Sequence, residues 1–103
     1  SKIIANVIRG YINFDGLLIS DDLSMQALSG DLRDRAKAAL SAGCDVVLHC
    51  NGQLKEMADI AGGIGLMGKL SQRRAIRAAS FCGKQVSPEE FADAKKTLDS
   101  LLV

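Results

Sequence analysis

The sequence predicts an α/β fold in which a helix joins two parallel strands and further helices follow. Residues 17–20 and 45–50 form two short apolar runs with the length and composition of strands buried on both faces. The alanine-rich segment 31–42 between them has helical periodicity. A strand, a helix and a strand within about 34 residues have the spacing of a βαβ unit, so we expect a parallel pair with a right-handed crossover.

Helices account for most of the remaining chain. Near the amino end, apolar residues at three- and four-residue spacing predict an amphipathic helix that ends before the turn at Asp15-Gly16. These residues are Ile3, Ile4, Val7, Ile8 and Tyr11. Residues 21–30 are polar and predict a loop, and Gly43 is placed to end the helix over 31–42. Helices are also expected over 54–61 and 71–81, and Ser87-Pro88-Glu89-Glu90 predicts the capped start of a last one.

Two strands are few for a free-standing α/β domain. Parallel sheets are normally covered on both faces, and a pair of strands leaves both outer edges unpaired. We therefore expect this chain of 103 residues to be part of a larger repeating β/α architecture.

Composition excludes several classes of protein. The chain is 48% hydrophobic and 24% charged, which argues against intrinsic disorder. Its net charge of +1 provides no strongly basic surface to bind nucleic acid or an acidic membrane. No apolar run approaches the roughly 18–20 residues of a membrane span. Cys44, Cys50 and Cys82 form no CxxC pair, so neither a disulfide framework nor a metal site is indicated, and a reducing, cytoplasmic setting is expected.

The strongest candidate site is the pair Asp21 and Asp22, where the first strand opens into a loop. Ligand sites in parallel α/β folds lie at the carboxyl ends of the strands. A solvated acidic turn explains the pair about equally well from the residues alone. Asn51-Gly52 follows the second strand at the equivalent place, but a plain turn is the favoured interpretation there.

Other motifs favour structural interpretations. His49 and Cys50 are adjacent in a strand and point to opposite faces, so a nucleophilic pair is disfavoured and His49 is expected to be structural. Residues 63–68 match GxGxxG, yet a charged, helical segment precedes them where a dinucleotide fingerprint needs a strand. The basic residues of the helix over 71–81 are expected to form a solvated face.

The segment 14–25, which reads FDGLLISDDLSM, resembles the nucleophile segment of glycoside hydrolase family 3 in its β-N-acetylhexosaminidase branch. Residues 42–48 and Cys50-Asn51 resemble the strand that follows it in those enzymes. Order and spacing agree over residues 1–52, whereas residues 53–103 resemble the family's C-terminal helices only in character. The resemblance implies the last two β/α units of a (β/α)₈ barrel, with the N-terminal part of the barrel as the missing partner.

The resemblance also implies a function. These enzymes remove terminal β-linked N-acetylglucosamine, including from cell-wall muropeptides during recycling, and retain configuration through a covalent glycosyl-enzyme. The nucleophile aligns with Asp21, and Asp22 and Met25 are expected to line or brace the substrate site. The acid/base of this branch is a His, backed by an Asp, on an earlier β/α unit, so the isolated chain is expected to be inactive. No cofactor is expected.

Two alternatives remain on the residues alone. One is a receiver-like signalling domain, because Asp21 and Asp22 end an apolar strand as Mg²⁺-binding carboxylates do. That fold needs five strands and an acceptor Asp at the end of a later one, whereas Asp45 begins its strand. The other is a non-catalytic helical interaction module with a solvated acidic loop.

Overall fold

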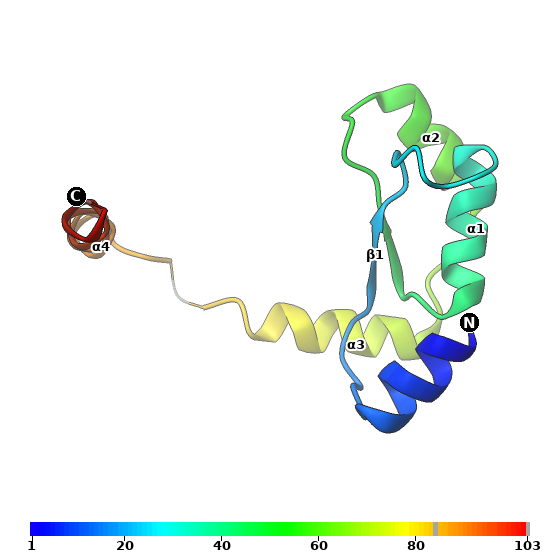
Figure 1. Cartoon of the computed structure of the whole chain (residues 1–103), viewed down its shortest axis with the longest axis horizontal. Helices are drawn as coiled ribbons and strands as arrows, with labels where there is room; N and C mark the ends of the chain where they lie inside the picture. Colours follow the sequence, from blue (N-terminus) through cyan, green and yellow to red (C-terminus); the bar gives the residue numbers. More distant parts are fainter. Residues whose placement is uncertain (84, 103) are drawn as a thin grey trace.

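The computed structural model describes residues 1–83 and 85–102 and confirms the βαβ unit. Strand β1 (Ile19–Asp22) pairs in parallel with β2 (Val46–Leu48), and α1 (Leu32–Ala42) lies between them in the chain. The other elements are the helix η1 (Ile4–Tyr11) at the amino end and α2 (Leu54–Gly63), α3 (Lys69–Ser80) and α4 (Pro88–Leu101) after the sheet. Figure 1 shows α1 and α2 beside the sheet, with α4 well apart from it.

The hydrophobic core lies between the sheet and its two covering helices. Leu23, just after β1, is 2% exposed and packs with Ala36 of α1 and Ile60 of α2. Half-buried apolar residues surround these three, namely Leu32, Ala39, Val47 and Ile64. The predicted apolar face of the helix over 31–42 is thus the face that α1 buries.

Strand β1 differs from its prediction in position and in burial. It begins two residues later than expected and includes Asp21 and Asp22, which we had placed in a loop. The backbone explains the shift, because Leu23 N donates to Leu48 O (2.9 Å) and so extends the pairing to the end of the strand. The prediction that both strands are buried on both faces is wrong for this chain. Ile19 and Leu48 are exposed because no described element covers them.

The pairing register contains an irregularity next to the candidate site. Ile19 pairs with Val46 and Asp22 with Leu48, so Ser20 and Asp21 together stand opposite the single residue Val47. Such a bulge kinks a strand and redirects its side chains, and bulges are over-represented next to active sites.

Local signals placed the ends of α1 and the start of α4 correctly, whereas α3 begins two residues earlier and α2 ends two residues later than predicted. The Asp31 side chain accepts from Asp34 N (2.8 Å) at the start of α1, and Gly43 ends this helix at φ +118°. The predicted capping box of Ser87 and Glu90 opens α4. The helix η1 differs from expectation in its winding: it is a π-helix, and Ile12 N donates to Val7 O (2.8 Å) five residues back.

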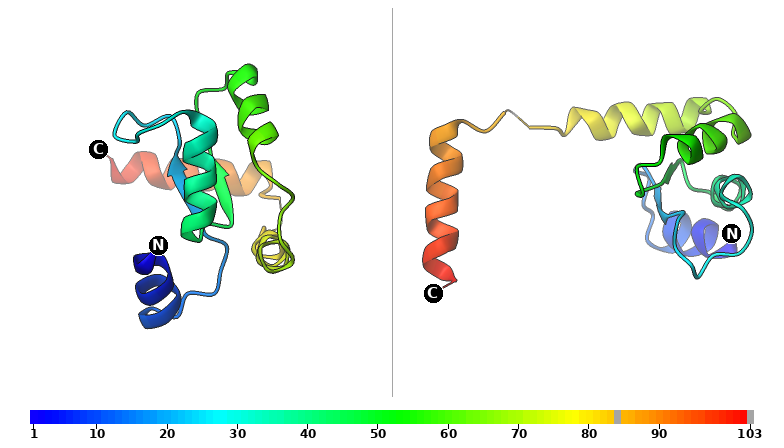
Figure 2. Two further views of the ribbon diagram at one scale, coloured as in Figure 1. Left: turned by 90° about the vertical axis from the view of Figure 1, so that its right-hand side faces the viewer. Right: turned by 90° about the horizontal axis from the view of Figure 1, so that it is seen from above.

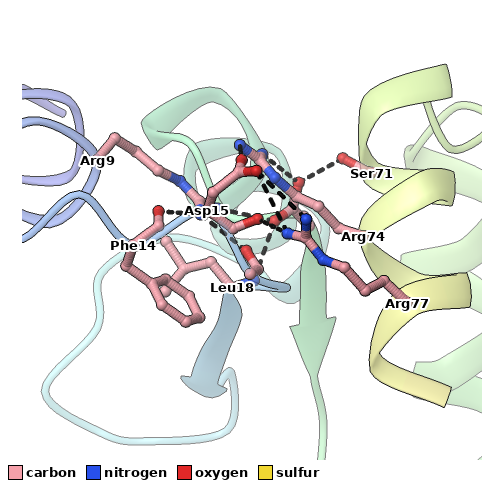
Figure 3. Close-up of polar contacts among 9 residues, drawn as sticks. Arg9, Phe14, Asp15, Leu18, Ser71, Arg74 and Arg77 are labelled. Carbon is pink, nitrogen blue, oxygen red and sulfur yellow. Dashed lines mark hydrogen bonds and ion pairs between the residues drawn. The ribbon is translucent and has the colours of Figure 1, made fainter. Parts of the chain in front are cut away.

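An ionic network joins η1, the starts of both strands and α3 (Figure 3). Asp45, whose side chain is 4% exposed, accepts from Arg9 Nη2 (2.9 Å) and Arg74 Nη1 (3.1 Å). Ser71 Oγ (2.6 Å) and Leu18 N (3.0 Å) also donate to it. The basic residues of the helix over 71–81 were expected to be solvated, and this is wrong for Arg74. Its side chain is 13% exposed and pairs with Asp15 and Asp45.

The network extends to the turn before β1. Arg74 Nη2 lies 3.0 Å from Asp15 Oδ1, and Arg77 donates to the backbone carbonyl of Asp15. Hydrogen bonds from Arg74 and Arg77 hold the pKa of Asp15 below its ordinary value. Figure 2 shows α3 extending away from the sheet toward α4. None of the helices described for residues 1–83 and 85–102 is both long and apolar enough to cross a membrane.

Candidate functional site

The loops that follow the two strands meet at the carboxyl end of the sheet, at Asp22. Its Oδ1 accepts from the backbone amides of Ser24 (3.0 Å) and Cys50 (3.1 Å), and its Oδ2 accepts from the Ser24 hydroxyl. Asp22 therefore joins the loop after β1 to the loop after β2. The two strand ends thus lie close together, with Asp22 as the link.

These donors also set the charge of Asp22. Hydrogen bonds from the Ser24 hydroxyl, and then from the Ser24 and Cys50 amides, hold the pKa of this carboxyl below its ordinary value. Asp22 is thus an anion whose oxygens already have donors. A carboxylate in this state serves as a brace better than as a nucleophile.

Asp21 has different surroundings from its neighbour. The Asp22 amide donates to Asp21 Oδ1 (2.8 Å), and no other hydrogen bond to its carboxylate is found among the described residues. The residue is exposed, and it lines an open hollow of about 420 Å³ together with Met25, Leu28 and Ala38. The structure thus brings Asp21 and Met25 to one hollow, which Asp22 does not line.

Arg35 holds the loop that carries Met25, a role the sequence did not reveal. Its guanidinium donates to the carbonyl oxygens of Leu23 (2.8 Å), Met25 (3.2 Å) and Gly30 (2.9 Å). An arginine inside an amphipathic helix is indistinguishable by pattern from a solvated one, so no sequence signal pointed to this role.

The residues after β2 make contacts with α2. His49 is buried, as a structural histidine is expected to be, and its Nε2 lies 2.8 Å from Glu56 Oε2. The Asn51 side-chain amide donates to the same oxygen, and Gln53 N donates to Asn51 Oδ1 (2.9 Å) in the predicted turn. Glu56 was not a predicted site residue, because a glutamate in the first turn of a helix is common on electrostatic grounds alone.

Two competing interpretations of the site lose support. Burial, and then the carboxylates of Asp22 and Asp21, raise the pKa of the Cys50 thiol, which disfavours a thiolate nucleophile. The receiver-like alternative needs an acidic residue at the end of a second strand, whereas Asp45 lies at the beginning of β2 in the ionic network. The segment matching GxGxxG follows α2, not a strand, as expected.

Comparison with known proteins agrees with this geometry. The model of the glycosyl hydrolase family 3 N-terminal domain matches residues 1–80, which end with α3. The chain belongs to glycosyl hydrolase family 3. The family match includes every residue of the candidate site and leaves α4 outside.

Similar family 3 relatives are named Beta-hexosaminidase. The protein from Tolumonas auensis is 39% identical over 80 residues, which cover 76% of this chain and 22% of the relative. The protein from Bordetella avium is 52% identical over 50 residues, or 47% of this chain and 14% of the relative. The protein from Methylococcus capsulatus is 50% identical over 50 residues, or 47% of this chain and 15% of the relative.

The matched part of this chain therefore spans less than a quarter of the length of each of these relatives. No solved structure matches the chain.

Proposed function

We propose that this chain is the nucleophile-bearing part of a retaining exo-β-N-acetylglucosaminidase, and that Asp21 forms the covalent glycosyl-enzyme. The observation that carries the proposal is the contrast between two adjacent carboxylates. Asp22 has donors on both oxygens, whereas Asp21 is exposed and accepts a single hydrogen bond. Family membership and the names of the relatives support the reaction class.

The chemistry requires an ionised carboxylate with room for the sugar. In a retaining mechanism the carboxylate attacks the anomeric carbon, and a second group about 5 Å away protonates the leaving oxygen. Asp21 and Met25 line an open hollow of about 420 Å³, which leaves space beside the proposed nucleophile. The protonating group is proposed to be a His backed by an Asp on an earlier β/α unit, outside this chain.

The parallel pair fits the last two β/α units of a (β/α)₈ barrel. Both strands end at the face that carries Asp21, as barrel strands do at their active-site face. The rest of the barrel would cover Ile19 and Leu48, which this chain leaves exposed. We further propose that the complete enzyme acts in the cytoplasm on glycans from recycled cell wall.

Trapping the intermediate in the complete enzyme tests the proposal. With a fluorinated N-acetylglucosaminide, mass spectrometry is expected to place the adduct on Asp21. Asp21→Asn should abolish the adduct, because an amide is a far poorer nucleophile.

Asp22→Asn is the matched control, since it changes the adjacent residue in the same way. It should slow adduct formation only about 10- to 100-fold, through altered loop geometry. An adduct on Asp22, or one that still forms in Asp21→Asn, would refute the assignment.

A further inference from the structure

His49 is a buried titratable side chain next to the proposed nucleophile Asp21 and its neighbour Asp22. It follows β2 directly, and its side chain is 7% exposed between β1 and α2. The Nε2 atom lies 2.8 Å from Glu56 Oε2. The Nδ1 atom is buried without a hydrogen-bond partner and lies 3.9 Å from Asp22 Oδ1.

The ring lies between two carboxylates. Glu56 Oε2 contacts Nε2, and Asp22 Oδ1 faces the buried Nδ1 across 3.9 Å. The titratable groups around the ring are Asp22 at the end of β1, Glu56 on α2 and the neighbouring Cys50.

A chain of contacts leads from this ring to Asp21. Asp22 Oδ1, the atom nearest His49 Nδ1, also accepts the Cys50 amide, so it anchors the loop after β2. The Asp22 backbone amide in turn donates to Asp21 Oδ1 at 2.8 Å. A shift of Asp22 therefore moves the single hydrogen bond that orients the Asp21 carboxylate.

We propose that His49 is a positioning residue: held by Glu56 against the Asp22 carboxylate, it fixes Asp22 and thereby orients Asp21 for attack. This inference rests on the proposed role of Asp21. His49 itself touches no reacting atom. Its effect is expected on the rate of glycosyl-enzyme formation and not on substrate binding, because it acts through the orientation of the nucleophile.

The test uses the complete enzyme and the variants His49→Gln and Glu56→Gln, with Lys55→Gln on the exposed side of α2 as control. In His49→Gln the amide nitrogen reaches the position of Nε2 and keeps the Glu56 contact, but nothing replaces Nδ1. We expect the rate of glycosyl-enzyme formation at pH 6 to fall about tenfold with KM within about twofold.

Glu56→Gln keeps the test decisive if His49→Gln fails to fold, since it changes only the partly exposed outer partner of the ring. Glu56→Gln should also lower the rate of glycosyl-enzyme formation, whereas Lys55→Gln should leave that rate unchanged. A wild-type rate equal to the variant rates, or a loss that appears in KM instead of in the rate, would overturn the positioning role. A wild-type enzyme that forms no adduct at all would instead overturn the proposed function.

Discussion

Replacing Asp45 tests whether the ionic network at the base of the sheet stabilises the fold. In Asp45→Asn, one oxygen remains to accept from Arg9, Leu18, Ser71 and Arg74, and the new amide nitrogen faces donors. Removing one partner of a buried ion pair costs about 3–5 kcal/mol. Because Asp15 and Arg77 leave one side of this network open to solvent, we expect the lower value, about 3 kcal/mol.

The assay is the urea midpoint of the complete enzyme, with Asp59→Asn as control. Asp59 pairs with Arg33 at 2.6 Å, but both side chains are about half exposed, so its loss should cost less than about 1 kcal/mol. Equal effects of the two substitutions would refute the reasoning from burial.

The same substitution has an expected pH dependence. Burial alone raises the pKa of Asp45, but the hydrogen bonds from Ser71, the Leu18 amide and Arg74 outweigh it and leave the pKa below its ordinary value of 3.8. A carboxyl with a lowered folded-state pKa stabilises the protein above its unfolded-state pKa, and this stabilisation is lost as the pH falls through the lowered value. The stability difference between wild type and Asp45→Asn should therefore stay constant down to about pH 5 and shrink below about pH 4.

Two predictions concern the isolated chain of residues 1–103. Purified chain should not hydrolyse a chromogenic β-N-acetylglucosaminide above an Asp21→Ala control, because the proposed acid/base lies outside it; turnover would contradict this. It should also self-associate or remain molten, since Ile19, Leu48 and the edges of both strands are uncovered. A sharp cooperative melt from a species that sediments as a monomer would show otherwise.

Features that depend on neighbouring residues were predictable from the sequence. The helix start at Ser87 and the helix end at Gly43 are set within a few residues, and both signals were correct. Resemblance to a family is the basis for proposing Asp21 as the nucleophile, since the residues alone do not distinguish it from Asp22. The structure distinguishes the two by the donors that occupy Asp22.

Contacts between distant segments could not be predicted. Arg74 has the pattern of a solvated residue, yet its partners Asp45 and Asp15 lie 29 and 59 positions away. The end of β1 was misplaced because Asp21 and Asp22 have low strand propensity, and only pairing with β2 makes them part of the strand. Glu56 was missed for a different reason: its partners His49 and Asn51 are near in sequence, but an acidic residue in the first turn of a helix is common on electrostatic grounds alone.

The two ends of this short sheet have opposite requirements, and the structure meets each with charged residues. At the amino end, Asp45 is buried and fully paired, so its charge is fixed and serves to join elements. At the carboxyl end, the proposed reaction needs an anion that remains available, which a fully paired carboxylate is not. Placing two aspartates in succession divides these tasks, because Asp22 takes the donors from both loops and leaves Asp21 open to the hollow. The register irregularity at Ser20 and Asp21 lies next to this pair of aspartates. It places one extra residue in β1 between the pairs Ile19–Val46 and Asp22–Leu48, which a regular ladder would not contain.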